Sequence, residues 1–322
     1  MWTERSIFAL VVWVLVGETM CLLFFYGYSK TALPNGKGDN YHSSRVINEE
    51  YNSKATEEEL IEEIKQIPQA ENFVDNRSDI RNGTLPTIFA VTPTYARPVQ
   101  KADLTRVGQT FLHIRNFHWI VVEDSSNKTS VVATLLQRSG INFTHLNRKS
   151  LPKARTKGAP QRNAGIEWLL ENVNVNETPG VVYFADDDNT YDLQIFDEMR
   201  YTRKVSVWPV GLVGGQMYER CLVGKDGTVT DWKVGWNRKR PFPIDMAGFA
   251  INLRLLKSKP KTRFPLKPKK YVDLESSLLV QLVTQEDLEP KASNCTKILV
   301  WHTRTEKPKL VYKIKDNVKI VV

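Results

Sequence analysis

Apolar and polar positions alternate along the middle of the chain in blocks that predict strands followed by helices. Short unbroken apolar runs at 87–91, 119–122 and 181–185 are typical of strands that are buried on both faces. Between them, apolar residues recur at helical spacing over 104–114, 131–136 and 161–173. This strand–helix alternation predicts an α/β protein with a doubly wound sheet.

The run at 181–185 is the most informative, because Asp186, Asp187 and Asp188 follow it directly. In open α/β sheets, ligands bind beyond the carboxyl ends of the strands. Adjacent carboxylates repel one another, and a divalent cation among them relieves the repulsion. If the chain stays extended, Asp186 and Asp188 share one side and Asp187 faces the other.

This acidic run predicts a magnesium or manganese site whose shell is completed by a nucleotide phosphate. The alternative is a solvated acidic turn that caps a helix beginning near Asp192. Neither a Gly-x-Gly-x-x-Gly motif nor a Walker sequence occurs in the chain, so a nucleotide would be held by metal and arginine instead.

Beyond residue 208 the pattern changes to hairpins and shorter elements. Asp226-Gly227 is a good hairpin turn signal, and Trp236 follows it closely. Glu275 opens a further helix, and the apolar run 298–301 predicts a late strand that leads into His302. Taken alone, Glu275 is typical of any acid in a first helical turn, and Trp236 of a core aromatic residue.

Residues 7–28 are almost continuously apolar and long enough, at roughly 20 residues, to span a bilayer. We expect a cytosolic tail at 1–6, an uncleaved signal anchor at 7–28 and a polar stem at 29–85, with the remainder in the lumen. A cleaved signal peptide is the alternative, but no clear small-residue cleavage site precedes the polar region. Glu18 would cost about 3 kcal/mol at the bilayer centre unless it is protonated or paired.

The net charge of +9, from 45 basic and 36 acidic residues, favours anionic partners. Nucleic acid is not indicated, because there is no zinc-finger spacing and no basic helix in heptads. Of the three cysteines, Cys221 and Cys295 could pair with each other, and an intermolecular disulfide through Cys21 is equally open. The Asn-x-Ser/Thr sequons fit a lumenal chain; they begin at Asn76, Asn82, Asn127, Asn142, Asn176 and Asn294.

A series of motifs between about residues 86 and 308 resembles the animal beta-1,3-glucuronosyltransferases. The resemblance implies a type II Golgi membrane enzyme with a GT-A fold, in which a Rossmann-like UDP-sugar-binding half at 86–208 joins an acceptor-binding half at 209–322. It also makes a homodimer plausible. The motifs are Pro93-Thr-Tyr95, Glu123-Asp124, Gln161-Arg-Asn163, Phe184 to Thr190, Trp208 to Gly215, Arg240 to Phe249, Glu275 to Leu279 and Trp301 to Lys307.

By this resemblance the chain transfers glucuronate from UDP-glucuronate to the 3-hydroxyl of a terminal galactose, with inversion and with manganese (Mn²⁺). Glu275 is then the catalytic base and Asp188 the metal ligand. The implied donor-binding residues are Pro93, Thr94, Tyr95, Asp124, Lys157, Arg162, Asp186, Asp187, Asp188, His302, Thr303 and Arg304. The implied acceptor-binding residues are Glu219, Trp236, Arg240 and Asp245, and we expect a glycan on Asn294.

Lys157 departs from the family pattern, since relatives often have arginine there. Lysine meets a carboxylate as a point charge and lacks the bidentate fork of arginine, so this departure bears on donor affinity and on the preference for glucuronate.

The acceptor is expected to be the galactosyl-galactosyl-xylosyl linker of proteoglycans. The segment Arg240-Pro-Phe-Pro-Ile-Asp245 favours that branch, because relatives that act on N-acetyllactosamine often carry alanine where Pro243 stands. Two alternatives stay open: transfer to N-acetyllactosamine on glycoproteins or glycolipids, and a non-catalytic sugar-binding relative.

Overall fold

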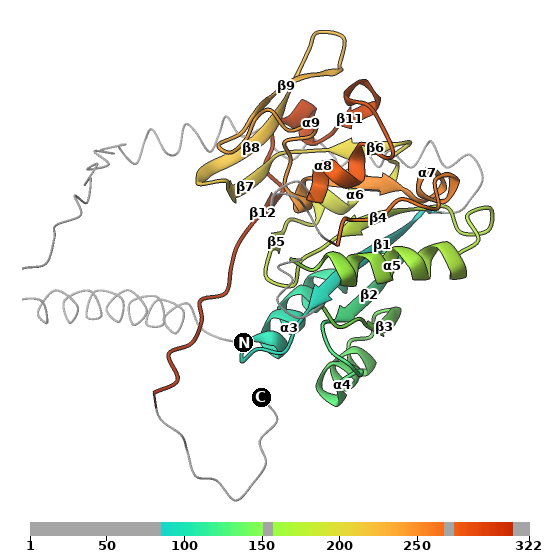
Figure 1. The fold of residues 1–322 in the computed structure, drawn as a ribbon, viewed down its shortest axis with the longest axis vertical. Coiled ribbons are helices and arrows are strands. Elements are labelled where there is room, and N and C mark those ends of the chain that lie inside the picture. The colour runs from blue at the N-terminus through green and yellow to red at the C-terminus, as the bar shows by residue number, and fades with distance from the viewer. Residues whose placement is uncertain (1–84, 151–156, 267–273, 312–322) are drawn as a thin grey trace, which may run out of the picture. The chain divides into compact units, whose positions relative to one another are not determined.

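The computed structural model describes residues 85–150, 157–266 and 274–311 (Figure 1). The predicted tail and anchor, and the stem up to residue 84, lie outside these ranges. Among the helices within them, none combines the length and the apolar character needed to cross a membrane.

The described chain forms two sheets and several helices (Figure 1). The larger sheet contains β1 (Thr87–Thr94), β2 (Phe117–Glu123), β3 (Phe143–Asn147), β4 (Gly180–Phe184), β6 (Val205–Val207), β10 (Phe249–Asn252) and β11 (Leu288–Pro290). The smaller sheet contains β5 (Thr190–Tyr191), β7 (Val210–Val213), β8 (Gln216–Val223), β9 (Val229–Lys233) and β12 (Val300–Trp301). The helices are α3 (Gln100–Phe111), α4 (Ser130–Arg138), α5 (Ala159–Asn172), α6 (Gln194–Arg200), α7 (Leu253–Ser258), α8 (Leu274–Leu279) and α9 (Ala292–Cys295), with 3-10 turns η2 (Met246–Gly248) and η3 (Gln285–Asp287).

The larger sheet has the strand order β11-β6-β10-β4-β1-β2-β3. The predicted parallel arrangement is confirmed for β4, β1, β2 and β3, which pair in parallel. On its other side β4 pairs antiparallel with β10, so the sheet is mixed. The apolar pattern could not orient β10, because a strand buried in the centre of a sheet reads alike in both directions. β10 and β11 both follow residue 209 in sequence and still belong to this sheet.

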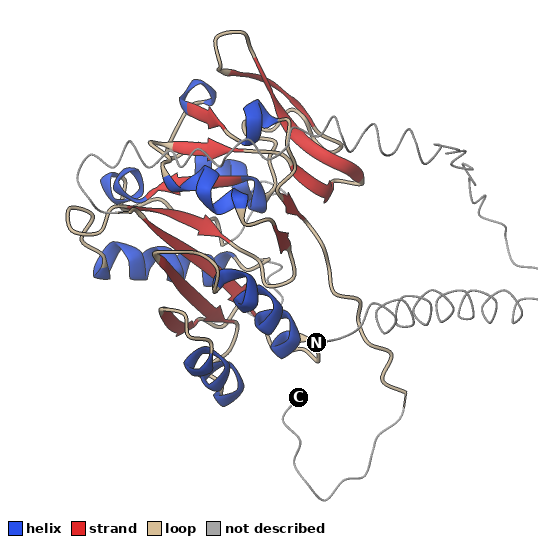
Figure 2. Ribbon diagram, turned by 180° about the vertical axis from the view of Figure 1, so that it is seen from behind, coloured by secondary structure: helices blue, strands red, loops and turns tan. Residues whose placement is uncertain are grey.

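Helices cover both faces of the larger sheet, as the alternation predicts (Figure 2). Along β4, Val182 and Phe184 belong to one apolar cluster together with Ile166 of α5. Val181 and Tyr183 belong to the other cluster, which includes residues of α3, α4 and α6. β4 is therefore buried on both faces, and its carboxyl end projects its acidic residues at the edge of a rigid layer.

A disulfide between Cys221 of β8 and Cys295 of α9 ties the smaller sheet to the turn before β12. The two Cα atoms are 6.1 Å apart, and both cysteines are buried. Of the two arrangements that the sequence left open, the pairing within the chain is thus confirmed. The hairpin at Asp226-Gly227 is also confirmed: it connects β8 to β9, and Gly227 has a φ of +80° that other residues rarely adopt.

Candidate functional site

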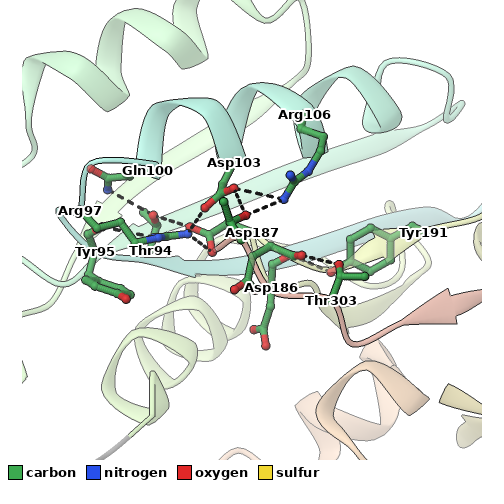
Figure 3. A network of polar contacts seen from close by, with 12 residues as sticks. Thr94, Tyr95, Arg97, Gln100, Asp103, Arg106, Asp186, Asp187, Tyr191 and Thr303 are labelled. Atoms are coloured by element: carbon green, nitrogen blue, oxygen red, sulfur yellow. Dashed lines mark hydrogen bonds and ion pairs between the residues drawn. The ribbon is translucent and has the colours of Figure 1, made fainter. Parts of the chain in front are cut away.

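The acidic run begins where β4 ends, and it folds into a turn instead of continuing as extended chain. Asp187 points toward α3, where its carboxylate accepts a hydrogen bond from Thr94 Oγ1 at 2.7 Å and pairs with Arg97 Nη2 at 2.8 Å (Figure 3). Asp186 points the other way and forms an ion pair with Arg162 of α5. The run is therefore more than a solvated cap, because each of these two acids has a fixed basic partner.

A pocket of about 370 Å³ lies beyond the carboxyl ends of β1, β2 and β4, and we call it the smaller pocket. This is the position that the crevice rule for α/β sheets predicts. It is lined by Pro93, Thr94, Tyr95, Arg97, Asp124, Ser150, Lys157, Gly158, Gln161, Arg162, Asp186, Asp187 and Asp188.

Arg162 is held firmly but still has capacity to bind. Its Nη1 donates to the carbonyl of Lys157 at 2.7 Å, and its Nη2 pairs with Asp186. Gly158 makes this packing possible: its φ is +79°, and a Cβ there would lie 2.8 Å from Arg162 Nη1. The Nε of Arg162 and the Oε1 of Gln161 are buried without a hydrogen-bond partner in the part of the chain that the structure describes. Such groups are expected to meet a ligand or water.

Burial dominates the electrostatics of the acids. It raises the pKa of Asp187 to about 6, and the charge of Arg97 and the hydrogen bond from Thr94 counteract part of that rise. Burial also raises the pKa of Asp188, and the neighbouring charge of Asp186 adds to the effect. Among the described residues, no hydrogen bond or ion pair engages the carboxylate of Asp188.

These residues fit a divalent cation that is completed by a ligand rather than by the protein. Within 85–150, 157–266 and 274–311, no group of three or more His, Cys, Asp or Glu side chains is arranged to hold a metal ion. Magnesium-like cations are commonly bound by one or two carboxylates together with substrate phosphates. The half-buried carboxylate of Asp188, next to Asp186, is a donor set of that kind.

Tyr95 and Asp124 both line the smaller pocket. The Tyr95 ring is 57% exposed, and the guanidinium of Arg97 lies over it at 4.7 Å from the centroid. The carboxylate of Asp124 accepts hydrogen bonds from the backbone N and the Oγ of Ser150, both at 2.7 Å. An exposed aromatic face beside a fixed carboxylate suits a planar ring that carries N–H groups.

A second cavity of about 730 Å³, the larger pocket, shares Lys157 with the smaller pocket, so the two adjoin. Its lining combines carboxylates, cations and exposed apolar surface. The residues are Lys157, Leu212, Val213, Gly214, Gly215, Glu219, Trp236, Arg240, Ile244, Asp245, Leu274, Glu275, His302, Thr303 and Arg304.

Glu275 lies in the first turn of α8 with its side chain only 16% exposed. Burial raises its pKa to about 7, and the charge of Asp245 adds to the rise. Arg240 Nη1 lies 3.8 Å from Glu275 Oε2, and the charge of Arg240 lowers the pKa of Glu275 in part. A carboxylate with a pKa near 7 is suited to accept a proton at neutral pH.

Asp245 and His302 both line the larger pocket, where Oδ2 of Asp245 lies 3.3 Å from Nδ1 of His302. The hydrogen bond and charge of Asp245 raise the pKa of His302, although burial opposes the change. Burial would raise the pKa of Asp245, but its hydrogen bonds and the charge of His302 outweigh burial and lower it. The pair therefore favours the imidazolium form of His302 and the ionised form of Asp245 more than water does.

Two further polar side chains of the larger pocket, Glu219 and Arg240, are held by different contacts. Glu219 accepts a hydrogen bond from the backbone N of Gly235 at 2.8 Å. Gly214 has a φ of +62°, and a Cβ there would lie 2.0 Å from Glu219 Oε1, so only glycine leaves room for the carboxylate. Arg240 lies over the ring of Trp236 at 5.0 Å, and that ring is 40% exposed.

The structure thus gathers every site residue predicted from the sequence, other than the sequon, into two adjoining pockets. Asn294 is exposed, as are Asn127, Asn142 and Asn176; Asn76 and Asn82 lie outside the described residues. Sequence reasoning missed Arg97 and Ser150. Arg97 could have been suspected, because it follows the end of β1 by three residues, but nothing in the local pattern marks Ser150.

The chain is similar in sequence to known proteins. The family Glycosyltransferase family 43 matches residues 107–306. Galactosylgalactosylxylosylprotein 3-beta-glucuronosyltransferase 1 of Homo sapiens is 54% identical over 256 residues, covering 76% of this chain and 77% of the relative. Galactosylgalactosylxylosylprotein 3-beta-glucuronosyltransferase 2 of Homo sapiens is 52% identical over 246 residues, covering 74% and 76%. The crystal structure of S. aureus TarS 1-349 in complex with UDP has a TM-score of 0.43 and 15% identity, covering 68% of this chain and 61% of that chain.

Proposed function

Because the chain belongs to glycosyltransferase family 43, we propose that it is a beta-1,3-glucuronosyltransferase that moves glucuronate from UDP-glucuronate to the 3-hydroxyl of a terminal galactose. The observation that carries the proposal is the adjacency of the two pockets. One contains carboxylates and arginines suited to a nucleotide diphosphate, the other contains a buried glutamate with a pKa of about 7, and Lys157 lies in both.

The smaller pocket is the donor site in this proposal, in the manner of a GT-A fold. The uracil ring stacks on Tyr95, and Asp124 accepts a hydrogen bond from a ring N–H. Arg162 contributes its unpartnered Nε to the donor, and Lys157, at the boundary between the pockets, meets the carboxylate of glucuronate. His302 and Arg304 contact the diphosphate from the larger pocket.

Manganese would be held by Asp188 together with the diphosphate, with Asp186 and Asp187 close by. When bound, the ion neutralises charge on the departing UDP. The residues of the chain contribute to the same end, because Asp245 raises the pKa of His302 and so favours the imidazolium, whose positive charge lies near the leaving group.

Glu275 is the catalytic base in this scheme. Its carboxylate takes the proton from the galactose 3-hydroxyl while that oxygen forms a bond to the anomeric carbon of glucuronate. The bond between this carbon and the UDP oxygen breaks, and UDP leaves with the electron pair. Attack from the face opposite UDP inverts the anomeric centre. Burial of Glu275 supports this role, because it keeps the carboxylate basic enough to accept a proton.

The acceptor lies in the larger pocket. Trp236 offers an exposed apolar face for a galactose ring, and Glu219, Arg240 and Asp245 can bind its hydroxyl groups. Because the relatives at 52–54% identity are named galactosylgalactosylxylosylprotein 3-beta-glucuronosyltransferases, we propose the glycosaminoglycan–protein linker as the acceptor, on a protein.

An acceptor panel tests this assignment. The full-length chain, purified in detergent, is assayed with UDP-glucuronate and either galactosyl-galactose or N-acetyllactosamine. We expect a higher kcat/KM with galactosyl-galactose. A preference for N-acetyllactosamine would support the second candidate, and UDP binding without transfer to either acceptor would support a non-catalytic relative.

For its location we propose a Golgi membrane, with an anchor at 7–28, a stem at 29–85, the catalytic part in the lumen and a homodimeric assembly. The disulfide between Cys221 and Cys295 supports an oxidising compartment. The exposed sequon at Asn294 supports exposure to the glycosylation machinery. Treatment with an N-glycosidase tests whether Asn294 carries a glycan. The parent chain should lose more mass than the Asn294→Gln variant.

A further inference from the structure

Asp103 is a buried carboxylate that lines neither pocket, yet it contacts two of the segments that form them (Figure 3). It lies in the first turn of α3 and is 0% exposed. Its Oδ2 accepts a hydrogen bond from Arg97 Nη2 at 2.7 Å. Its Oδ1 accepts hydrogen bonds from Thr305 Oγ1 at 2.5 Å and from Arg106 Nη2 at 3.1 Å. A carboxylate buried so completely is stable only with such partners.

The first arm of this contact network runs through Arg97, which lines the smaller pocket. Arg97 Nη2 lies between two carboxylates, 2.7 Å from Asp103 and 2.8 Å from Asp187. The same guanidinium covers one face of the Tyr95 ring at 4.7 Å. A guanidinium that is held on two sides fixes the ring it stacks on, and it leaves the exposed remainder of the ring to a ligand.

The second arm runs through Thr305 to the segment that follows β12. Thr303 Oγ1 donates to the carbonyl of Asp188 at 2.6 Å, and Thr305 Oγ1 donates to Asp103. These two anchors lie on either side of Arg304, which lines the larger pocket. The segment 303–305 is thus fixed at both ends, and the hydrogen bond to Asp103 fixes the end nearer to α3.

We propose that Asp103 is a positioning residue that sets the geometry of the donor site through two separate arms. Through Arg97 it orients the Tyr95 ring for the uracil, and through Thr305 it fixes the segment that brings His302 and Arg304 to the diphosphate. This proposal rests on the proposed function, since it assumes that a uridine diphosphate sugar occupies the smaller pocket.

The two arms predict different responses to ligands that contain different parts of the donor. Binding of uridine and of UDP with manganese is measured by saturation-transfer NMR and calorimetry on the full-length chain. Arg97→Met should weaken both ligands by about tenfold, whereas Thr305→Val should weaken UDP and leave uridine unchanged. Asp103→Asn should weaken both.

Thr105→Val is the matched control. Thr105 is exposed on α3 and its Oγ1 donates to the carbonyl of Lys101 at 2.7 Å, so in the described chain it is hydrogen-bonded to neither Asp103 nor Thr305. This control variant should bind uridine and UDP with the same Kd as the parent chain. Thermal unfolding of each variant and the KM for the acceptor are measured in parallel, because a merely structural role would lower stability without separating uridine from UDP.

The outcomes discriminate among the explanations. A folded Asp103→Asn variant that binds uridine and UDP normally overturns the positioning role. The positioning role is also overturned if all four variants lose affinity for uridine and for UDP to the same extent as each other, or only in proportion to their loss of thermal stability. If Asp103→Asn does not fold, the Arg97 and Thr305 variants still test the proposal, because each removes one of the two contacts with Asp103. A parent chain that binds neither ligand contradicts the proposed function itself.

Discussion

Nδ1 of His302 lies 3.3 Å from Oδ2 of Asp245, so one buried carboxylate influences both the cation proposed for the diphosphate and the proposed base. Asp245 raises the pKa of His302, and it also raises the pKa of Glu275. The pair therefore adds positive charge where UDP would leave and adds basicity where the acceptor proton would go.

The first prediction concerns pH. Glu275 must be ionised to accept a proton, and its pKa is raised to about 7 by burial and by Asp245. Activity should therefore rise with pH and level off above about 7, with kcat/KM for the acceptor falling about tenfold per unit well below that value. Asp245→Asn should move this acidic limb to lower pH, because the negative charge that raises the pKa is removed. A limb that stays in place in that variant would contradict the coupling.

The second prediction isolates the base. Glu275→Gln keeps the shape of the side chain and removes its ability to take a proton. We expect kcat to fall by about a hundredfold or more, while the Kd of UDP measured with manganese stays near that of the parent chain. Turnover at the parental rate would remove Glu275 from the mechanism.

The third prediction concerns the metal. Asp188→Ala should abolish the manganese-dependent part of UDP binding, because its carboxylate lines the smaller pocket and has no hydrogen bond or ion pair with the residues that the structure describes. Calorimetry with and without manganese measures the effect. Asp197→Ala, an exposed acid on α6, is the matched control and should bind UDP normally. Manganese-dependent binding that persists in Asp188→Ala would rule out Asp188 as the ligand.

The fourth prediction concerns donor preference. Lys157→Arg provides a bidentate fork for the glucuronate carboxylate, so the KM for UDP-glucuronate should fall severalfold. The KM for UDP-glucose, which lacks the carboxylate, should change little. Equal effects on the two donors would show that residue 157 does not contact the carboxylate.

The fifth prediction concerns stability. Replacing Cys221 and Cys295 together by serine opens a loop of 74 residues in sequence separation and should lower the free energy of unfolding by about 2–5 kcal/mol. Chemical denaturation measures the change, and Cys21→Ser is the control that should leave it unaltered. A reductant should lower the denaturation midpoint of the parent chain to that of the double variant, and it should leave the midpoint of the double variant unchanged.

Local patterns in the sequence determined much of the fold between residues 86 and 208. The sequence predicted three strands and three helices there, namely β1, β2, β4, α3, α4 and α5. This was possible because apolar runs and helical stripes are patterns among residues that are close together in the sequence. The position of the smaller pocket beside the acidic run followed from the crevice rule, because the carboxyl ends of parallel strands meet at one edge of the sheet. Motif resemblance added the acceptor residues, which no local pattern distinguishes from ordinary surface charges.

Tertiary structure alone decided the partners and the electrostatics. Asp103 and Thr305 are separated by 202 positions, and no periodicity relates two side chains that only the fold brings together. The direction of β10 was likewise open, because a strand buried in the middle of a sheet has the same apolar pattern in both orientations. Glu275 reads in the sequence as an ordinary acid at a helix start. Its pKa of about 7 arises from burial and from Asp245, which lies 30 positions earlier in the chain.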